Sequence, residues 1–429
     1  MVIRMKKKKL FIAIICTVIL LGYGCNQRDA NQTDIQSNAN QTEDDIISNV
    51  ENVENSNTTT TKDQEKDDMK EQDGRTEDGN ILDDQEYGVT WENEVITVYE
   101  PRNGGVWYPR MYQLSNGTIL CGFDTNEDGG RAVIKIVRSV DGGLTWSGEA
   151  IQATNYPEYD CANANFIELE NGELWVAYRA NVAKDDVYYS SIRVSVSKDG
   201  GITWEPHSIV AEEEGTGGVY EPQFGYIGDA IAVFYANDSL NVVRNGRQQN
   251  IEFKVWEEDR WSDKIIASDG TKTFSRDGMP VWCQLEDGSY ALVIEATSLS
   301  PSYDFIIQMK TSVDGLDWSG ALHNIYLPNQ MKKKAGAPYI VKIPDGRVAV
   351  SFQTDEDATK NGDAYSKMKV MISKDATASE FLPATVPFDT PDGFCSNWNS
   401  LLSNKDYLYA VTSTNYPSDC ILLKRGSIK

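Results

Sequence analysis

The sequence predicts an all-β fold, a six-bladed β-propeller formed by residues 86–429. The first observation is a turn typical of β-hairpins, which recurs between two apolar segments at nearly constant intervals. The turn glycines are separated by 55, 56, 60 and 58 residues, and they are Gly117, Gly172, Gly228, Gly288 and Gly346. A sixth turn follows at Asn404-Lys405. Repeats of about 40–60 residues, each with about four strands, are typical of propeller blades, so six repeats predict six blades.

The second observation is an apolar strand directly after each turn. These six strands are expected at Thr118–Phe123, Glu173–Tyr178, Ala230–Phe234, Ser289–Ile294, Arg347–Phe352 and Tyr407–Val411. Because the chain also has 10 Trp, 21 Tyr and 12 Phe, it can bury a large core between such strands.

The third observation is a motif in the later hairpin of the repeat. It reads Ser-Val-Asp-Gly-Gly-Leu-Thr-Trp at residues 139–146 and Ser-Lys-Asp-Gly-Gly-Ile-Thr-Trp at residues 197–204. A shortened copy lies at residues 312–318 and a degenerate one at residues 373–375. These are Asp-boxes, the motif of sialidase-type propellers. We expect Asp141 and Asp199 to have a structural role, because an Asp in such a turn can accept its backbone N–H groups while Gly supplies the positive φ.

Residues 1–24 are interpreted as the signal peptide of a bacterial lipoprotein. Arg4 and Lys6–Lys9 precede the apolar run Leu10–Leu21, which is too short to span a bilayer but suits a signal-peptide core. The run ends just before Cys25, which we expect to carry the lipid. The predicted location is therefore the extracellular face of a bacterial cell membrane, with plain secretion as the alternative.

Residues 25–85 are predicted to be a disordered acidic linker. They contain no Phe, Trp or Tyr, so they cannot bury enough apolar area to offset the entropy of the chain. The formal charge of −25 comprises +5 from residues 1–25, −12 from residues 26–85 and −18 from residues 86–429. About half of the excess negative charge thus belongs to a spacer that says nothing about the ligand.

The composition also excludes several classes of function. So acidic a protein repels phosphate, so nucleic acid is not expected as a partner. His207 and His323 are the only histidines, which makes a histidine metal site or relay improbable, and no metal or other cofactor is expected. The cysteines never form a CxxC pair. Of Cys121, Cys161, Cys283, Cys395 and Cys420, at least one must stay unpaired in the monomer that we expect.

Strand direction predicts where a ligand site lies. The strands before and after each turn run antiparallel, so the start of the first and the end of the second share one face of the propeller. Polar side chains stand seven residues after every turn, at Asp124, Arg179, Tyr235, Glu295, Gln353 and Thr412. Others stand seven residues before three turns, at Arg110, Asn165 and Glu221. We therefore predict two polar rings at the mouth of the central channel, a usual place for a ligand.

Within these rings the chemistry narrows to a pair of carboxylates, Glu221 and Glu295. Glycoside hydrolysis needs one carboxyl as acid/base and one as nucleophile or base on either side of the glycosidic oxygen. Asp124 and Asp128 are weaker candidates, because they lie in a loop rich in turn residues. Trp107, Tyr108, Trp282 and Trp398 could stack on sugars at the mouth or pack between blades. The residues expected to bind substrate are Arg110, Asp124, Asn165, Arg179, Tyr235, Arg276, Asp277, Trp107 and Trp398.

Residues 97–412 resemble glycoside hydrolase family 93, the exo-α-1,5-L-arabinanases, within the sialidase superfamily. The similar stretches are Tyr108-Pro-Arg110, Tyr220-Glu221-Pro222, residues 276–280 (Arg-Asp-Gly-Met-Pro) and residues 335–339 (Ala-Gly-Ala-Pro-Tyr). Tyr220 stands where the family has Trp. The resemblance implies that Glu221 is the nucleophile and Glu295 the acid/base of a retaining mechanism through a covalent glycosyl-enzyme.

The expected function is therefore exo-acting cleavage of a plant-type arabinan or related oligosaccharide by an exported enzyme, with the membrane contacted only through the lipid at Cys25. The two carboxyl groups are expected about 5–5.5 Å apart, as in retaining enzymes. An exo-α-sialidase is the nearest alternative, with Arg110 as the first arginine of its triad and Arg179 or Arg276 as a neighbour. Its tyrosine nucleophile, however, has no counterpart in Asn397-Trp398-Asn399. A non-catalytic carbohydrate-binding propeller is the other alternative.

Overall fold

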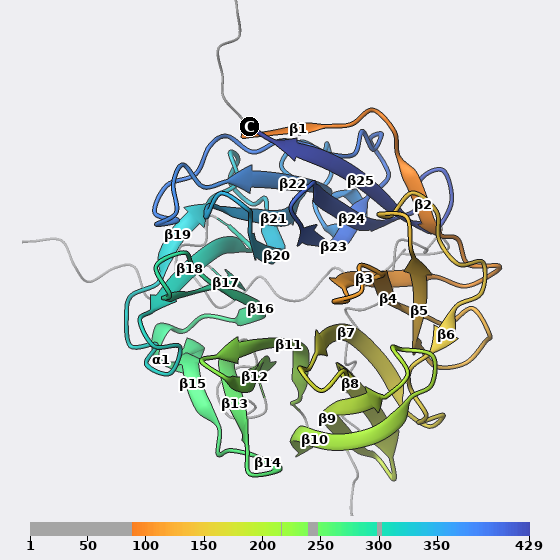
Figure 1. The fold of residues 1–429 in the computed structure, drawn as a ribbon. Helices are drawn as coiled ribbons and strands as arrows, with labels where there is room; N and C mark the ends of the chain where they lie inside the picture. Colours follow the sequence, from red (N-terminus) through yellow and green to blue (C-terminus); the bar gives the residue numbers. More distant parts are fainter. Residues whose placement is uncertain (1–87, 216, 239–247, 298–302) are drawn as a thin grey trace, which may run out of the picture. The chain divides into compact units, whose positions relative to one another are not determined.

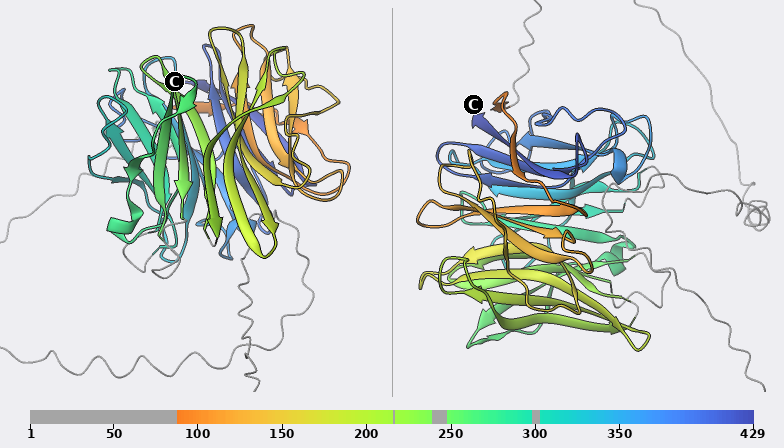
Figure 2. Two further views of the ribbon diagram at one scale, coloured as in Figure 1. Left: turned by 90° about the horizontal axis from the view of Figure 1, so that it is seen from below. Right: turned by 90° about the vertical axis from the view of Figure 1, so that its right-hand side faces the viewer.

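The computed structural model describes residues 88–215, 217–238, 248–297 and 303–429. In this part of the chain six antiparallel sheets surround one axis, with β3, β7, β11, β16, β20 and β23 innermost (Figure 1). Figure 2 shows the propeller edge-on, with its strands running between two faces. The predicted all-β six-bladed propeller is confirmed. The predicted signal peptide, Cys25 and the linker 25–85 lie outside the described residues.

Blades I and II are regular four-stranded sheets. Blade I contains β3 (Val106–Gln113), β4 (Ile119–Thr125), β5 (Val133–Ser139) and β6 (Ile151–Gln152). Blade II contains β7 (Asp160–Glu168), β8 (Leu174–Lys184), β9 (Val187–Ser197) and β10 (Glu205–Gly215).

Blades III and IV lie next around the axis and are separated by the short helix α1 (Gly270–Thr273). Blade III contains β11 (Val219–Ile227), β12 (Ala230–Asn237), β13 (Asn250–Glu257), β14 (Arg260–Trp261) and β15 (Ile265–Ser268). Blade IV contains β16 (Asp277–Gln284), β17 (Tyr290–Ala296), β18 (Ile306–Ser312) and β19 (His323–Tyr326).

Blades V and VI close the ring. Blade V contains β20 (Ala335–Lys342), β21 (Val348–Thr354) and β22 (Lys367–Ile372), with the 3₁₀ turn η2 (Asp363–Tyr365) between β21 and β22. Blade VI contains β23 (Ser396–Ser403), β24 (Leu408–Thr414) and β25 (Cys420–Ile428). Its outer strands come from the other end of the described chain, because β1 (Val89–Trp91) and β2 (Ile96–Tyr99) both pair with β25. The repeat did not predict this closure.

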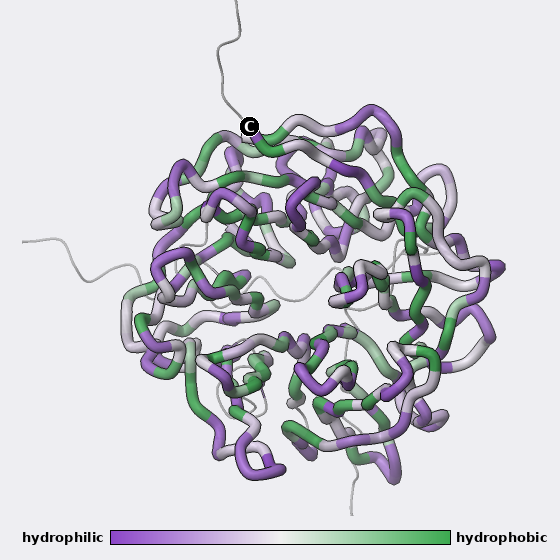
Figure 3. Tube along the Cα trace, viewed as in Figure 1, coloured by the Kyte–Doolittle hydropathy of each residue, from purple (hydrophilic) through white to green (hydrophobic). Residues whose placement is uncertain are grey.

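The predicted turns and strands are where the repeat placed them. The five turn glycines have φ between 58° and 89°, a conformation that costs Gly little and other residues more. The six apolar strands that follow are β4, β8, β12, β17, β21 and β24, each second in its blade. Figure 3 shows hydrophobic stretches on strands in every blade and hydrophilic stretches in many connecting loops.

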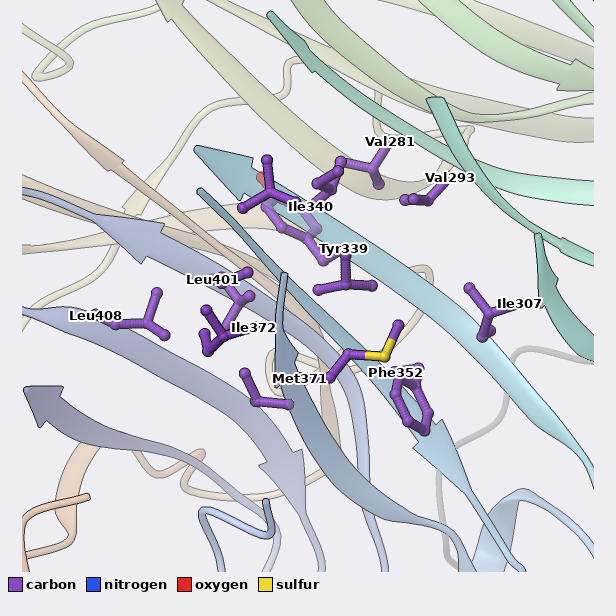
Figure 4. Close-up of a cluster of buried hydrophobic side chains, with 14 of the residues drawn as sticks. Val281, Val293, Ile307, Tyr339, Ile340, Phe352, Met371, Ile372, Leu401 and Leu408 are labelled. Carbon is purple, nitrogen blue, oxygen red and sulfur yellow. The ribbon is translucent and has the colours of Figure 1, made fainter. Parts of the chain in front are cut away.

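Apolar side chains pack between neighbouring blades. The largest cluster joins blades IV, V and VI and includes Val293, Phe352 and Leu401, all at most 1% exposed (Figure 4). Burying one such side chain contributes about 1.5–3 kcal/mol, so many similar contacts hold the ring of blades together. The cysteines Cys121, Cys161, Cys283 and Cys420 are free thiols on these strands.

The Asp-boxes have the structural role that the sequence predicts. Asp199 accepts hydrogen bonds from the backbone N–H groups of Ile202 (3.0 Å) and Thr203 (2.9 Å) and from the hydroxyls of Ser197 and Thr203. The indole N–H of Trp204 donates to Gly201 O within the same turn. Asp141 makes the same contacts with Ser139 and Thr145. These carboxylates hold turns at the face opposite the mouth of the channel.

Candidate active site

Every innermost strand carries a β-bulge near its start. The bulged residue has a left-handed φ of 47–61° in all six blades, and the pairing with the second strand shifts there. The six residues are Tyr108, Asn163, Glu221, Met279, Ala337 and Trp398. Bulges re-aim side chains and free backbone groups from the ladder. Here they create one ring of backbone N–H groups and side chains around the mouth.

In blades I, IV and V a side chain at the end of the second strand accepts a hydrogen bond from this ring in the next blade. The Asn163 N–H donates to Asp124 Oδ1 (2.9 Å), the Ala337 N–H to Glu295 Oε2 (2.9 Å) and the Trp398 N–H to Gln353 Oε1 (2.8 Å). The predicted ring of Asp124, Glu295 and Gln353 thus has a geometric reason, since each acceptor satisfies a bulge donor across a blade boundary.

Blade III has no such acceptor at the end of its second strand, and Glu221 supplies one from the bulge. At the end of its second strand the residue opposite Tyr220 is Ala236, which has no side-chain acceptor. Glu221, the bulge residue of that blade, takes the role instead, and its Oε2 accepts the Met279 N–H at 2.8 Å. Its carboxylate therefore lies over the boundary between blades III and IV.

The prediction that Glu221 occupies the same position in its blade as Arg110 and Asn165 in theirs was wrong. Nine residues separate Tyr108 from Gly117 and Asn163 from Gly172, whereas seven separate Glu221 from Gly228. The structural counterparts of Glu221 are therefore Tyr108 and Asn163. The turn of blade III is shorter by one residue, and its glycine comes first in the turn rather than last. This shift hid the correspondence, although Glu221 lies at the mouth.

Glu221 and Glu295 come together around the dipeptide Gly278-Met279. Glu221 accepts the Met279 N–H, and a Cβ on Gly278 would lie 3.2 Å from Glu295 Oε1. Glu295 Oε1 also accepts from Arg276 Nη1 at 2.6 Å. The pairing of two glutamates at the mouth, predicted from the repeat, therefore corresponds to one compact cluster with Arg276. Their carboxyl separation of about 5–5.5 Å stays a prediction.

The two carboxyl groups have different electrostatic environments. Glu295 is buried in contact with a guanidinium and a backbone N–H, and both contacts stabilise a carboxylate. The pKa of Glu221 is raised to about 7, chiefly by burial, while the charge of Arg276 lowers it and that of Glu295 raises it. Glu221 is thus arranged to retain a proton near neutrality, whereas Glu295 is held by a cation and a backbone N–H.

Glycine is required beside Glu295. A Cβ on Gly336 would lie 2.7 Å from Glu295 Oε2, closer than side chains tolerate. Gly336 and the adjacent Ala337 therefore leave space for the carboxylate while the Ala337 N–H binds it.

The opposite side of the mouth holds a second charged group, Asp124 with Arg179. Asp124 is 2% exposed, and burial raises its pKa well above the usual range, opposed by the charge of Arg179. Arg179 Nη2 lies 3.5 Å from Asp160 Oδ1 at the start of blade II. These two predicted site residues share the mouth with the glutamate pair, since Arg179 is close enough to lower the pKa of Glu221.

An aromatic and apolar floor lies between these charged groups. Tyr108, Met279 and Ala337 form a small buried cluster at the axis, against which Trp107 and Trp398 pack. The rings of Tyr108 and Trp398 stack with centroids 4.5 Å apart. Aromatic faces beside carboxylates and guanidinium groups are suited to the mixed polar and apolar faces of a sugar.

Four residues predicted to bind substrate make contacts within the fold instead, and they are Arg110, Asn165, Tyr235 and Asp277. Arg110 is buried and donates to the carbonyl oxygens of Trp398 (2.9 Å) and Asn399 (3.2 Å), so it ties blade I to blade VI. Asn165 accepts the Phe224 N–H at 2.7 Å and ties blade II to blade III.

Tyr235 and Asp277 point away from the mouth. Tyr235 is 1% exposed in the cluster between blades II and III, because its strand is one residue out of phase with the ring and Ala236 takes the ring position. Asp277 is fully buried and accepts from Ser268 Oγ at 2.6 Å. Alternation along β16 places Arg276 on the site side and Asp277 on the other. Trp282 and Thr412, which were also considered, are buried as well.

The structure adds residues that sequence reasoning missed. Lys334 Nζ lies 2.5 Å from Asp363 Oδ1, and Gln353 Nε2 donates to the same oxygen at 2.9 Å. Phe305 lies under Arg276, with the guanidinium carbon 5.2 Å from the ring centroid. These side chains come from loops of variable length between strands, where the repeat gives no phase. The one signal that could have pointed to Lys334 and Asp363 is Gln353, whose position in the ring the repeat predicts.

No group of three or more His, Cys, Asp or Glu side chains in the described residues is placed to hold a metal ion. Nor does the described part of the chain contain a helix long and apolar enough to cross a membrane.

Comparisons with known proteins identify a matching family model and solved structures of similar fold. Residues 78–253 match the family described as BNR repeat-like domain. A comparison of the sequence with curated proteins found no significant match. Among solved structures, the family 93 α-L-arabinofuranosidase of Fusarium graminearum with arabinobiose is 19% identical, with 80% of this chain and 98% of that chain covered and a TM-score of 0.63.

Two further solved structures extend the comparison. The α-L-arabinanase of Penicillium chrysogenum with arabinobiose is 19% identical over 79% of this chain and 98% of that one, with a TM-score of 0.61. The NanB sialidase of Streptococcus pneumoniae is 11% identical over 76% and 70%, with a TM-score of 0.54. The described residues thus have the sialidase-like six-bladed propeller fold, and the resemblance to family 93 structures seen in the sequence holds in the fold.

Proposed function

We propose that this protein is a glycoside hydrolase that releases sugar from the end of a neutral, arabinan-like glycan with retention of configuration. The observation that carries the proposal is the pair Glu221 and Glu295 around Gly278-Met279, in which Arg276 binds one carboxylate while burial raises the pKa of the other. Environments that separate the pKa values of two carboxyl groups assign them to acid and anionic roles.

The reaction would proceed in two balanced steps. In the first, the protonated carboxyl gives its proton to the glycosidic oxygen while the ionised carboxylate attacks the anomeric carbon, so the glycosidic bond breaks and an ester bond forms. In the second, the first carboxyl, now a carboxylate, removes a proton from water, which attacks the anomeric carbon and releases the sugar and the free carboxylate.

The division of roles between the two glutamates is open to a direct test. The family resemblance implies that Glu221 attacks and Glu295 donates the proton. The charges of the unliganded site favour the reverse, since Glu295 is bound to Arg276 and Glu221 has a pKa of about 7. Two interacting carboxyl groups titrate as a pair, so the identity of the covalently modified residue, rather than a pH profile, decides between them.

A neutral sugar suits the charges at the mouth. Arg276 is paired with Glu295, Arg179 lies near Asp124 and Asp160, and Lys334 is paired with Asp363. No cation of the described mouth is thus without an acidic neighbour, which leaves little net positive charge for an anionic substrate. Arabinobiose bound by the Fusarium and Penicillium proteins supports arabinan as the first substrate to test.

The sialidase alternative is weaker. A sialidase needs three arginines free to hold a carboxylate, but Arg110 donates to backbone carbonyl oxygens and Arg276 is bound to Glu295. Tyr108 does lie near Glu221, but burial raises its pKa, which makes the phenol a poorer nucleophile. A purely carbohydrate-binding propeller would have no need of two carboxyl groups with such different environments.

Export and lipid anchoring belong to the same proposal. The basic and apolar start of the sequence and Cys25 support attachment to the outer face of a bacterial membrane, where an extracellular glycan is accessible. Globomycin treatment of cells, which blocks processing of lipoprotein signal peptides, should then cause an unprocessed precursor to accumulate. A Cys25→Ser variant that is processed and released like the unchanged protein would contradict lipidation.

The proposed activity is tested by incubating the protein with linear α-1,5-arabinan and, separately, with a sialoside. We expect sugar release from arabinan, none from the sialoside, and loss of release in Glu221→Gln. Release from neither glycan, or full activity of Glu221→Gln, would overturn the proposal.

A further inference from the structure

A cavity of about 860 Å³ opens between blades III and IV. One wall comes from β15 and α1, and the other from β18 and the segment that follows it. Figure 1 shows α1 and β15 at the rim, on the side of blade III next to blade IV. The volume is within the range of about 300–1,000 Å³ that is usual for ligand sites.

The wall formed by β18 carries the polar side chains of Gln308 and Lys310. Alternate residues of a strand share a face, and Ile306, Gln308 and Lys310 line the cavity. Register with the second strand makes Val137 of blade I and Met371 of blade V the counterparts of Lys310. Both counterparts are at most 2% exposed and pack in the core. The counterparts in blades II, III and VI are Ser195, Lys254 and Lys424. Lys254 and Lys424 are partly exposed, whereas Lys310 is buried at the wall of the cavity.

The Lys310 ammonium is buried with few partners. It is 9% exposed and donates to Ala267 O at 3.1 Å, and no carboxylate of the described residues lies within 4.0 Å of it. An ammonium has three N–H donors, so donors remain for a ligand in the cavity. Burial lowers its pKa, as expected for a cation removed from water.

The other cavity groups balance this charge. Lys272 is paired with Asp269 at 2.9 Å, and Asp317 accepts the N–H of Ser319 at 2.8 Å with acceptor capacity left over. The amide of Gln308 donates to Asn324 at 2.8 Å, and Trp318 lies in the same wall. Donors, acceptors and apolar surface without a strong net charge suit an uncharged hydroxylated ligand rather than a phosphate or a fatty acid.

One end of the cavity is next to the active site. Ser275 and Thr297 line it, and Thr297 Oγ1 accepts the backbone N–H of Arg276 at 2.8 Å. The side chain of Arg276 is bonded to Glu295. Only the residues just before β16 therefore separate the cavity from the proposed catalytic pair. A glycan held in the cavity would lie close to the site of cleavage.

We propose that this cavity is an auxiliary binding site for a segment of neutral glycan, with Lys310 and Asp317 as its principal hydrogen-bonding groups. The inference rests on the proposed function for the kind of polymer, but it concerns binding and not cleavage. Occupation of the cavity would retain a polymer between successive cleavages and would be irrelevant to short substrates that reach only the mouth.

Two substitutions test the site without touching the mouth. Ala321→Trp fills the cavity from an exposed lining position. Lys310→Met removes the donors and introduces the residue that packs at this position in blade V. Val313→Trp is the matched control, because Val313 is 88% exposed in the neighbouring turn and does not line the cavity.

Binding is measured by native gel electrophoresis and calorimetry, with linear α-1,5-arabinan and a soluble neutral β-glucan as probes and arabinobiose as the short ligand. All variants carry Glu221→Gln so that turnover does not interfere. We expect Ala321→Trp and Lys310→Met to weaken binding of at least one polymer about tenfold or more, while Val313→Trp does not. Arabinobiose binding should stay the same in all variants, and their melting temperatures should stay close to that of the parent.

Equal polymer binding by Ala321→Trp and Val313→Trp would overturn the inference, as would binding of neither polymer. A loss of arabinobiose binding in parallel with polymer binding would also overturn it, because the effect would then lie at the mouth. Failure of the proposed function appears separately, as absence of hydrolysis by the unchanged protein.

Discussion

Carboxylates at the two faces of this propeller have opposite environments. At the Asp-box face, Asp141 and Asp199 are exposed, and hydrogen bonds from their own turns hold their pKa values low, that of Asp141 at about 2. At the channel mouth, burial raises the pKa of Asp124 and Glu221. The first group is ionised and structural, whereas the second can carry protons near neutrality.

The difference shows that the repeated Asp-boxes mark structure, whereas the proposed catalytic pair combines a regular ring position, Glu295, with an interruption of the repeat, Glu221. The Asp-box recurs because each blade needs the same turn. Glu221 is a departure from the repeat, since the short hairpin of blade III and Ala236 allow its carboxylate to take the place of a ring acceptor. The following predictions test this contrast, from the largest expected effect to the smallest.

Glu221→Gln and Glu295→Gln should each lower kcat/KM on arabinan by about 10³-fold or more, because each removes a proton donor or an anionic nucleophile. Steady-state kinetics on arabinan measures the effect. Glu149→Gln, at an exposed position on the Asp-box side, is the matched control and should keep full activity. A tenfold loss or less in both mouth variants would show that the pair is not catalytic.

Gly336→Ala should lower kcat/KM by about 10–100-fold, because the new Cβ would lie 2.7 Å from Glu295 Oε2 and must displace it. The readout is kinetics together with a melting curve. Gly148→Ala, where no atom lies within 4 Å of the added Cβ, should be neutral. Unchanged activity of Gly336→Ala would mean that the position of Glu295 is unimportant.

The activity should fall by about tenfold per pH unit above pH 7. The raised pKa of Glu221, about 7, means that the pair holds one proton below this pH and loses it above. Both assignments of roles need a singly protonated pair, so kcat/KM should decline on the alkaline side in either case. A profile flat from pH 6 to 9 contradicts the raised pKa.

Glu221→Gln should make the protein more stable at pH 8 by about 2–5 °C in Tm. The folded-state pKa of Glu221 lies above its ordinary value of 4.5, so its stabilising contribution is complete below pH 4.5 and is lost as pH rises through 7. Because the Gln amide does not ionise, the variant does not lose stability as the pH rises through 7. The difference in Tm between variant and parent should therefore shrink towards pH 4.5, and a difference independent of pH would argue against a buried, proton-binding carboxyl.

Asp199→Ala should lower Tm by about 2–4 °C and leave kcat/KM unchanged, because it removes the acceptor of the Ile202 and Thr203 N–H groups far from the mouth. Lys198→Ala, at the exposed neighbouring position, should change neither quantity. A catalytic defect in Asp199→Ala with an intact fold would reverse the assignment of the two faces.

Much of the fold followed from the sequence, because turn glycines and Asp-boxes are local signals repeated in phase. The strands after Gly117, Gly172 and Gly288 needed only this pattern. Closure of blade VI by β1 and β2 could not be predicted, since pairing with β25 joins segments more than 300 residues apart and leaves no periodic signal.

The sequence located some residues of the site and misplaced others. Asp124, Arg179 and Glu295 occupy ring positions with a constant phase, so counting from the turn found them. Tyr235 was misplaced, because its strand is shifted by one residue relative to the ring, which moves the side chain to the other face. Asn165 is in phase with Arg110, but its side chain bonds to the Phe224 N–H between blades II and III. The bulges that position Glu221 depend on backbone conformation, which residue types such as Tyr108 and Trp398 do not reveal.

The central claim is that Glu221 and Glu295 perform glycoside hydrolysis through a covalent intermediate. The most direct measurement is to trap that intermediate with a mechanism-based arabinofuranosyl inhibitor and to map the modified residue by peptide mass spectrometry. We expect a single adduct on one of these two glutamates, absent when that residue is Gln, and its position assigns the nucleophile. An adduct on Tyr108 or on a residue outside the mouth would contradict the account.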